Sequence, residues 1–399
     1  MTKPKFCHSE KNIGNLIRVI DEVLQSYISN PQSIFQSYSE FIEYQFENVC
    51  RRNKVWYRKS KCMVPNCQAK AIQKSHTLPR SMSLRPIAED GKVLTPQFNP
   101  KTSSLELKEV GLAKASTFPG FCEVHERLFH EFEQNNFISN KHELYLQVYR
   151  STCREIYRTK HVSAQFESVI SKIKYLRDRR LLEKLRNILI LYGMQNNFDI
   201  NGLSVVEDSL FTMFEERFNN IKNHHIALSE ILPTFENHLF HGQQVGTYVS
   251  AITIDIKIPV ALSGSATIEI NHKCYRRKLS IVMGLMPSGN RSLFFVAGRK
   301  DDHQEIENYF SYWKKNPFSM LALAETWMLN GTDQWYITPS VWRAIPEMRK
   351  KELLNIIMSY DQNIGGDSGI SIFDEIRIKL LSEITCPAYV ISKESSKMS

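Results

Sequence analysis

The sequence predicts a mixed α+β protein. Helical N-terminal and middle segments surround a small, zinc-stabilised ββα-like module, and an antiparallel sheet with helices follows. Three observations lead to this prediction. Apolar residues recur at helical spacing in two long stretches, Cys and His residues pair within a Pro- and Gly-rich stretch, and apolar residues alternate with polar ones from 244 to 298. The 399 residues are enough for two or three domains.

The first 50 residues are expected to be helical. Leu16, Ile20 and Leu24 recur at helical spacing, the pattern breaks at Asn30-Pro31, and it resumes near Phe46. This periodicity is typical of amphipathic helices that pack on a neighbouring element. We therefore expect an N-terminal helical segment over 1–50.

The stretch 51–136 is rich in Pro and Gly and carries two short Cys/His pairs. Small loop-rich modules bury few apolar side chains and commonly need a metal to hold them. Zinc binds four N or S ligands in tetrahedral geometry, and two turns brought together by a loop supply such a set. The candidate zinc ligands are Cys62, Cys67, Cys122 and His125. The alternative is that these are ordinary buried residues.

The same stretch is strongly basic. Ten Lys and Arg residues and no Asp or Glu lie between Arg51 and Arg85, whereas the whole chain has a net charge of only +9. Cations neutralise phosphates and aromatic rings stack on bases, so this local charge indicates a nucleic-acid-binding face. The alternative is a solvated basic turn. The candidate contact residues are Arg51, Arg52, Lys54, Trp56, Arg58, Lys59, Lys74 and Arg80.

Residues 137–240 are expected to be helical, with Gly193 ending one long helix. Residues 241–392 form a predicted α+β domain with four strands in an antiparallel meander, and the tail 393–399 is expected to be disordered. The chain begins without a secretory signal, contains no apolar run of membrane-spanning length and has scattered cysteines. We therefore expect a cytoplasmic protein with no membrane association, in which close cysteines bind metal.

The module resembles the zinc-bearing branch of the HNH (His-Me finger, ββα-metal) endonucleases over residues 58–134. In that family a Cys pair precedes a strand ending in a catalytic His, and a loop then leads to a helix opened by a second Cys/His pair. The corresponding parts are Cys62/Cys67, the strand AIQKSH ending at His76, the loop 77–117, and FCEVHERLFHEFE. Ser75 stands where the family has a second His, and Asn99 is a substitute for its central Asn.

The resemblance implies that His76 is the general base that activates water against a phosphodiester. It also implies a catalytic Mg²⁺ or Mn²⁺ ion, for which Glu126 and His130 are the best ligand candidates because they lie four residues apart on one helical face. Two other roles for His76 remain open. In the first, His76 is a zinc ligand and His125 faces solvent; in the second, His76 is a structural histidine.

The preferred function is a metal-dependent endonuclease acting on DNA, and a role in defence against foreign DNA would fit by analogy. The alternatives are a non-catalytic, zinc-stabilised nucleic-acid-binding protein and an assembly protein. With the preferred function, the C-terminal domain would sense a trigger, mediate homo-oligomer formation or bind an unidentified protein partner. Nucleic acid, with DNA favoured over RNA, is the expected partner.

Overall fold

The structure is a computed structural model. It describes residues 10–29, 40, 43–44, 47–48, 56, 60–196, 199–200, 209–243, 246–272, 275–358, 364 and 369–384. The chain divides by its contacts into two units, one of residues 1–52 with 160–223 and one of residues 53–159 with 224–399. The module and the C-terminal region, which we expected as separate segments, therefore belong to the same unit. The predicted disordered tail lies outside the described residues.

The first unit is helical, as the apolar periodicity predicts. It contains α1 (Glu10–Ser29) and parts of α5 (Lys141–Leu191) and α6 (Ser209–His241). Leu16 packs in a small core with Leu181, Leu185 and Leu189. Gly193 ends α5 with a positive φ of 68°, and the amide of Met194 donates to the carbonyl of Leu189 at 2.8 Å. This is the glycine-terminated helix end that the sequence predicts.

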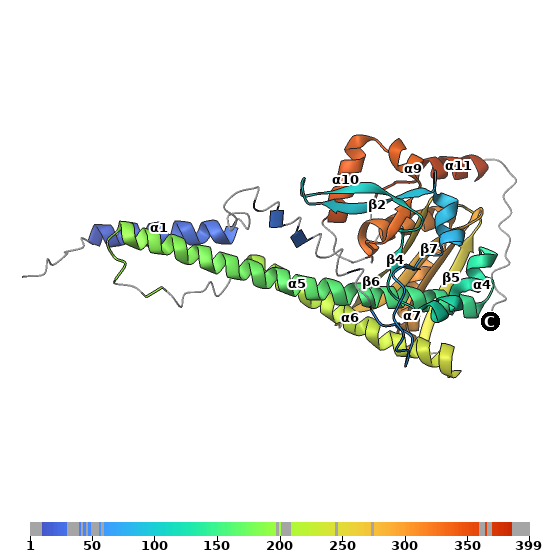
Figure 1. Ribbon diagram of the computed structural model, residues 1–399. Helices are drawn as coiled ribbons and strands as arrows, with labels where there is room; N and C mark the ends of the chain where they lie inside the picture. Colours follow the sequence, from blue (N-terminus) through green and yellow to red (C-terminus); the bar gives the residue numbers. More distant parts are fainter. Residues whose placement is uncertain are drawn as a thin grey trace, which may run out of the picture. The chain divides into compact units, whose positions relative to one another are not determined.

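The second unit is built on a seven-stranded antiparallel sheet (Figure 1). Its order is β3-β2-β9-β6-β7-β8-β5. The strands are β2 (Lys92–Asn99), β3 (Ser104–Gly111), β5 (Thr247–Ile254), β6 (Val260–His272), β7 (Tyr275–Ser288), β8 (Arg291–Arg299) and β9 (Trp335–Ile337). The mixed α+β class and the four C-terminal strands are confirmed. The simple meander is corrected, because β5 pairs with β8 and not with β6.

Both faces of this sheet are buried, since alternate residues of a strand point to opposite faces. On β7 the side chains of Ile281 and Met283 enter one core, whereas Val282 enters the other. The first core is covered by α7 (His303–Trp313), α8 (Pro317–Thr326), α9 (Pro339–Ala344), α10 (Glu347–Met358) and α11 (Asp374–Ile384). The second is covered by the module and by the portions of α5 and α6 in this unit. The site described below lies on this second face.

The expected loop 77–117 contains β2 and β3, which form a hairpin paired from Lys92↔Gly111 to Asn99↔Ser104. Leu94 of β2 also pairs with Ile337 of β9, so the hairpin extends the C-terminal sheet. The module is therefore joined to the sheet by backbone pairing. None of the described helices combines the length and the apolarity needed to cross a membrane.

Candidate functional site

The four predicted zinc ligands converge in the structure. The ligand atoms of Cys62, Cys67, Cys122 and His125, here called the Cys3His cluster, lie within 4.8 Å of one another. Among the residues that the structure describes, it is the one group of three or more His, Cys, Asp or Glu side chains arranged to hold a metal ion. The cluster could bind a zinc ion.

The distances within the cluster fit a tetrahedral ion. Zinc–sulfur bonds of about 2.3 Å and zinc–nitrogen bonds of about 2.0 Å place tetrahedral S···S pairs about 3.8 Å apart and S···N pairs about 3.5 Å apart. The sulfurs of Cys67 and Cys122 are 3.9 Å apart, and Nδ1 of His125 lies 3.3 Å from Cys62 Sγ and 3.4 Å from Cys122 Sγ. These three distances are close to those of a tetrahedral site, and all other pairs of ligand atoms lie within 4.8 Å.

Local backbone structure brings the two pairs together. Asn66 adopts a left-handed φ of 61°, which turns the chain so that Cys67 faces Cys62. Cys122 is the N-cap of α3 (Glu123–Glu126), which places His125 one turn later. The amide of Met63 donates to the carbonyl of Gly120 at 2.9 Å, and this bond joins the two halves. A Cβ at Gly120 would lie 2.4 Å from the Phe118 ring, so this close approach requires glycine.

The pKa values of the two buried thiols in the cluster are shifted in opposite directions. Burial raises the pKa of the Cys62 thiol to about 11. Burial acts in the same direction on Cys122, but backbone and side-chain hydrogen bonds outweigh it and lower the pKa of that thiol. Zinc binds thiolates, so ion binding supplies the positive charge that ionised Cys62 needs in this buried place.

His76 lies in a second group of side chains, separate from the Cys3His cluster. It ends β1 (Ser75–His76), which pairs antiparallel with β4 (Thr117–Phe118). Helices α3 and α4 (His130–Asn135) follow β4. His76 thus lies at the end of a two-residue strand, and a helical segment follows the strand that pairs with it. His76 is absent from the candidate metal group, whereas His125 is part of it.

The imidazole of His76 is partly buried and oriented. Its Nδ1 lies 2.9 Å from the carbonyl oxygen of Ala115. A carbonyl can only accept, so Nδ1 carries the proton and Nε2 is left as an acceptor. Burial, together with the nearby positive charge of Arg150, lowers the pKa of His76, which favours the neutral ring. The side chain therefore has the protonation state that a general base needs.

Glu126 lies close to the same group. Its carboxyl is hydrogen-bonded by the Ser75 hydroxyl, and burial raises its pKa. One carboxylate oxygen is buried and has no hydrogen-bond partner among the described residues. His130, four residues on, is exposed. The charges that act on Glu126 include those of Arg150, Glu133 and His130, so these groups share one region.

The predicted nucleic-acid contacts are only partly described. Arg51, Arg52, Lys54, Arg58 and Lys59 lie outside the described residues. The indole of Trp56 donates to the carbonyl of Thr117 at 3.2 Å and packs edge-on against Tyr157, with ring centroids 5.1 Å apart. Trp56 therefore anchors the chain to β4 through contacts that the sequence could not show.

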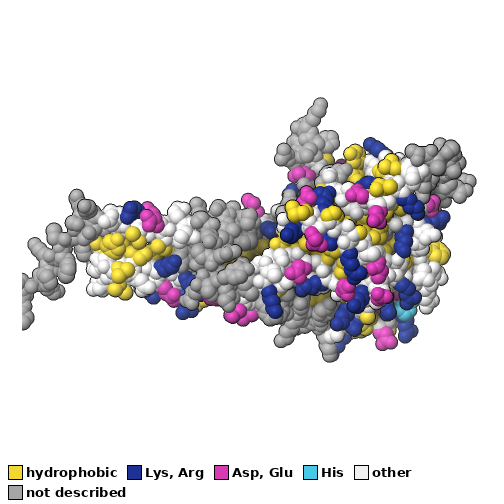
Figure 2. All heavy atoms as spheres, turned by 90° about the horizontal axis from the view of Figure 1, so that it is seen from above, with side chains coloured by type: hydrophobic (Ala, Val, Ile, Leu, Met, Phe, Trp, Pro, Cys, Tyr) yellow, Lys and Arg dark blue, Asp and Glu magenta, His cyan; other side chains and the backbone are white. Residues whose placement is uncertain are grey.

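Two predicted cations flank His76 on the surface. Lys74 and Arg80 are exposed, and the Arg80 charge reaches His76. An open hollow of about 440 Å³ runs along residues 70–74, directly before β1. Figure 2 shows Lys and Arg interspersed with Asp and Glu on the face it presents, so that view offers no continuous basic surface.

Sequence reasoning missed the polar residues of α5 behind the site. Arg150 and Gln147 are fully buried, although helical periodicity marks such residues as solvent-facing. Their burial arises from packing against the module. Comparisons with protein-family models, with curated proteins and with solved structures found no match to this chain.

Proposed function

We propose that this protein is a metal-dependent endonuclease that hydrolyses phosphodiester bonds in DNA, with a structural zinc ion in the Cys3His cluster. The observation that carries the proposal is the placement of His76. Its strand is paired to β4, its Nδ1 is satisfied by Ala115, and its Nε2 is left to accept a proton. The incompletely paired carboxylate of Glu126, which is hydrogen-bonded by the Ser75 hydroxyl next to His76 in the chain, supports the same proposal.

In this mechanism Nε2 of His76 takes the proton of the attacking water. The lowered pKa keeps the ring ready to accept it near neutral pH. Lys74 and Arg80, on either side of the strand, neutralise the backbone phosphates that flank the scissile bond. The Ala115 carbonyl stabilises the protonated ring through its bond to Nδ1.

A hard divalent ion beside His76 would have few protein ligands. Mg²⁺ is commonly bound through one or two carboxylates together with substrate phosphates. Glu126, with its unpartnered oxygen, and the neighbouring His130 would hold such an ion. When bound, Mg²⁺ or Mn²⁺ supplies Lewis-acid polarisation of the phosphate.

The test is nicking of supercoiled plasmid by purified protein with Mg²⁺ or Mn²⁺, with zinc quantified in every preparation. We expect His76→Ala to lower the rate by about 10²–10⁴-fold at unchanged zinc content. His142→Ala, an exposed histidine on α5, is the matched control and should cleave like the wild type. Parallel loss of zinc in His76→Ala would instead make His76 a structural or metal-binding residue.

A non-catalytic, zinc-stabilised nucleic-acid-binding protein is the second candidate. It is favoured by the finding that the described residues assemble no group of three metal ligands around His76. In that case the wild type binds DNA with one zinc per chain but does not nick it. His76→Ala then leaves DNA affinity unchanged.

A further inference from the structure

The strand of His76 and helix α4, which begins at His130, are joined by a buried bridge from α5. Nε2 of Gln147 donates to the carbonyl of Thr77, the residue after His76, at 3.0 Å. Oε1 of Gln147 accepts from Arg150 at 3.0 Å, and Arg150 forms an ion pair of 2.7 Å with Oε1 of Glu133. An unbroken polar chain thus connects the two halves of the candidate site.

Arg150 is held against the helix by more than its charge. Its guanidinium carbon lies 4.4 Å from the ring centroid of Phe129 and 5.3 Å from that of Phe132. Cation–π contacts and a charged hydrogen bond together fix the guanidinium plane. Because the Arg150 side chain is 0% exposed, it cannot touch a substrate.

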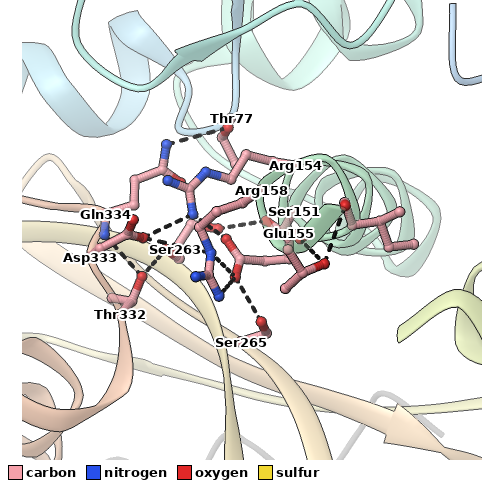
Figure 3. Close-up of polar contacts among 12 residues, drawn as sticks. Thr77, Ser151, Arg154, Glu155, Arg158, Ser263, Ser265, Thr332, Asp333 and Gln334 are labelled. Carbon is pink, nitrogen blue, oxygen red and sulfur yellow. Dashed lines mark hydrogen bonds and ion pairs between the residues drawn. The ribbon is translucent and has the colours of Figure 1, made fainter. Parts of the chain in front are cut away.

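The far side of the same strand end is held by the C-terminal sheet. The amide of Thr77 donates to the carbonyl of Ser116 at 2.8 Å. Gln334, just before β9, contacts both the Thr77 and Ser116 hydroxyls, and Figure 3 shows its side chain directed toward Thr77. The Thr77 carbonyl is therefore the group through which α5 holds this turn, whereas Ser116 and Gln334 hold the Thr77 amide and hydroxyl.

We propose that Gln147 and Arg150 are positioning residues that hold the strand of His76 at a fixed distance from α4, the helix that begins at His130. This inference rests on the proposed nuclease function for its catalytic consequence, but the bridge itself does not. General-base catalysis depends steeply on geometry, and a displacement of about 1 Å can cost about 100-fold in rate. Neither residue contacts substrate, so the effect falls on kcat and not on KM.

The test compares Gln147→Met with Gln147→Glu. Met has a similar volume and makes no hydrogen bond, whereas Glu keeps the acceptor for Arg150 and loses the donor to Thr77. We expect both to lower kcat for nicking by 10- to 100-fold with KM for DNA and zinc content unchanged. Gln134→Met, at an exposed position of α4, is the control and should behave as the wild type.

A second readout does not depend on nuclease activity. Nitrogen NMR of the wild-type His76 ring should show a single tautomer with the proton on Nδ1. Both Gln147 variants should show exchange between tautomers, because the ring is no longer held against Ala115. If the Gln147 variants show altered ring signals but the wild type does not cleave DNA, the positioning role of the bridge is supported and the nuclease function is rejected.

The proposal is overturned if the folded, zinc-loaded variants keep wild-type kcat and wild-type ring signals. It is also overturned if kcat falls only in proportion to the unfolded fraction. Should Gln147→Met fail to fold, Gln147→Glu decides the question, since its carboxylate pairs with Arg150 and offsets the loss of the donor.

Discussion

Nδ1 of His76 lies 2.9 Å from the carbonyl oxygen of Ala115, on the chain segment that leads into β4. The bond closes the strand pair at the position where the candidate base must be held. It also fixes which ring nitrogen is free. The orientation of His76 thus depends on backbone that the sequence places 39 residues away.

Zinc binding should depend on Cys122 and not on Cys153. We expect Cys122→Ser to reduce zinc from one equivalent per chain to near zero and to lower the melting temperature, because metal binding and folding of such a module are coupled. Cys153 is equally buried but lies outside the Cys3His cluster, so Cys153→Ser is the matched control. Metal analysis with thermal unfolding checks this, and retained zinc in Cys122→Ser would contradict the assignment.

DNA affinity should depend on salt through Lys74 and Arg80. Each substitution to Ala should reduce the slope of log K against log salt by about 1, because one phosphate contact is lost. Lys101, exposed at the tip of the β2–β3 hairpin, is the comparison. Fluorescence anisotropy over a salt series provides the slopes. Equal slopes in all three variants would show that Lys74 and Arg80 do not contact DNA phosphates.

His224 should make the protein less stable in mild acid. Its Nε2 lies 2.7 Å from Ser265 Oγ and its Nδ1 2.9 Å from Ser280 Oγ, and burial, with Arg158 nearby, lowers its pKa from 6.5 to about 4. The unfolded chain therefore binds more protons between these values. The contribution of His224 is complete above pH 6.5 and decreases as the pH falls toward 4, by about 3 kcal/mol in total.

The measurement for His224 is urea unfolding at pH 7 and pH 5. In His224→Gln the difference in unfolding free energy between the two pH values should shrink relative to wild type. His142→Gln, at an exposed position, should leave it unchanged. An unchanged difference in His224→Gln would show that other groups govern the acid sensitivity.

Glu325 should anchor the C-terminal helix. Its buried carboxylate accepts from the amides of Ile372 and Phe373, at 2.5 and 3.0 Å, and from two nitrogens of Arg377. Glu325→Gln leaves Arg377 without its counter-charge, which should cost about 3 kcal/mol. Hydrogen exchange across α11 should then rise, whereas Glu375→Gln, exposed on the same helix, should not change it.

Features that depend on residues close together in the sequence could be predicted from it. The Cys3His cluster was found because each Cys/His pair is a local turn. The C-terminal strands were found because stretches such as TYVSAITIDIKI alternate apolar and polar residues and are separated by turn residues. The β2–β3 hairpin was missed because Pro96 interrupts its pattern. The structure tolerates Pro96 because β2 is paired along its full length on one side only, with one pairing to β9 on the other.

Long-range partners account for the remaining differences. The three residues of β9 pair with β2 and β6, and no local pattern reveals a strand that short. Arg150 is buried because Phe129 and Glu133 pack around it, and nothing in the α5 sequence indicates that. Sequence periodicity therefore fails to predict the burial of polar residues that tertiary packing covers.

The pairing of Leu94 with Ile337 sets an order of events during synthesis. The four residues of the Cys3His cluster are all translated by residue 125. The partners of the β2 edge and of the Ser116 amide, which donates to the Tyr336 hydroxyl at 2.6 Å, lie in a segment more than 200 residues later. Contacts of such sequence separation form late because loop closure must come first. A ribosome-bound chain therefore contains all four residues of the Cys3His cluster long before it contains the segment that completes the sheet beside His76.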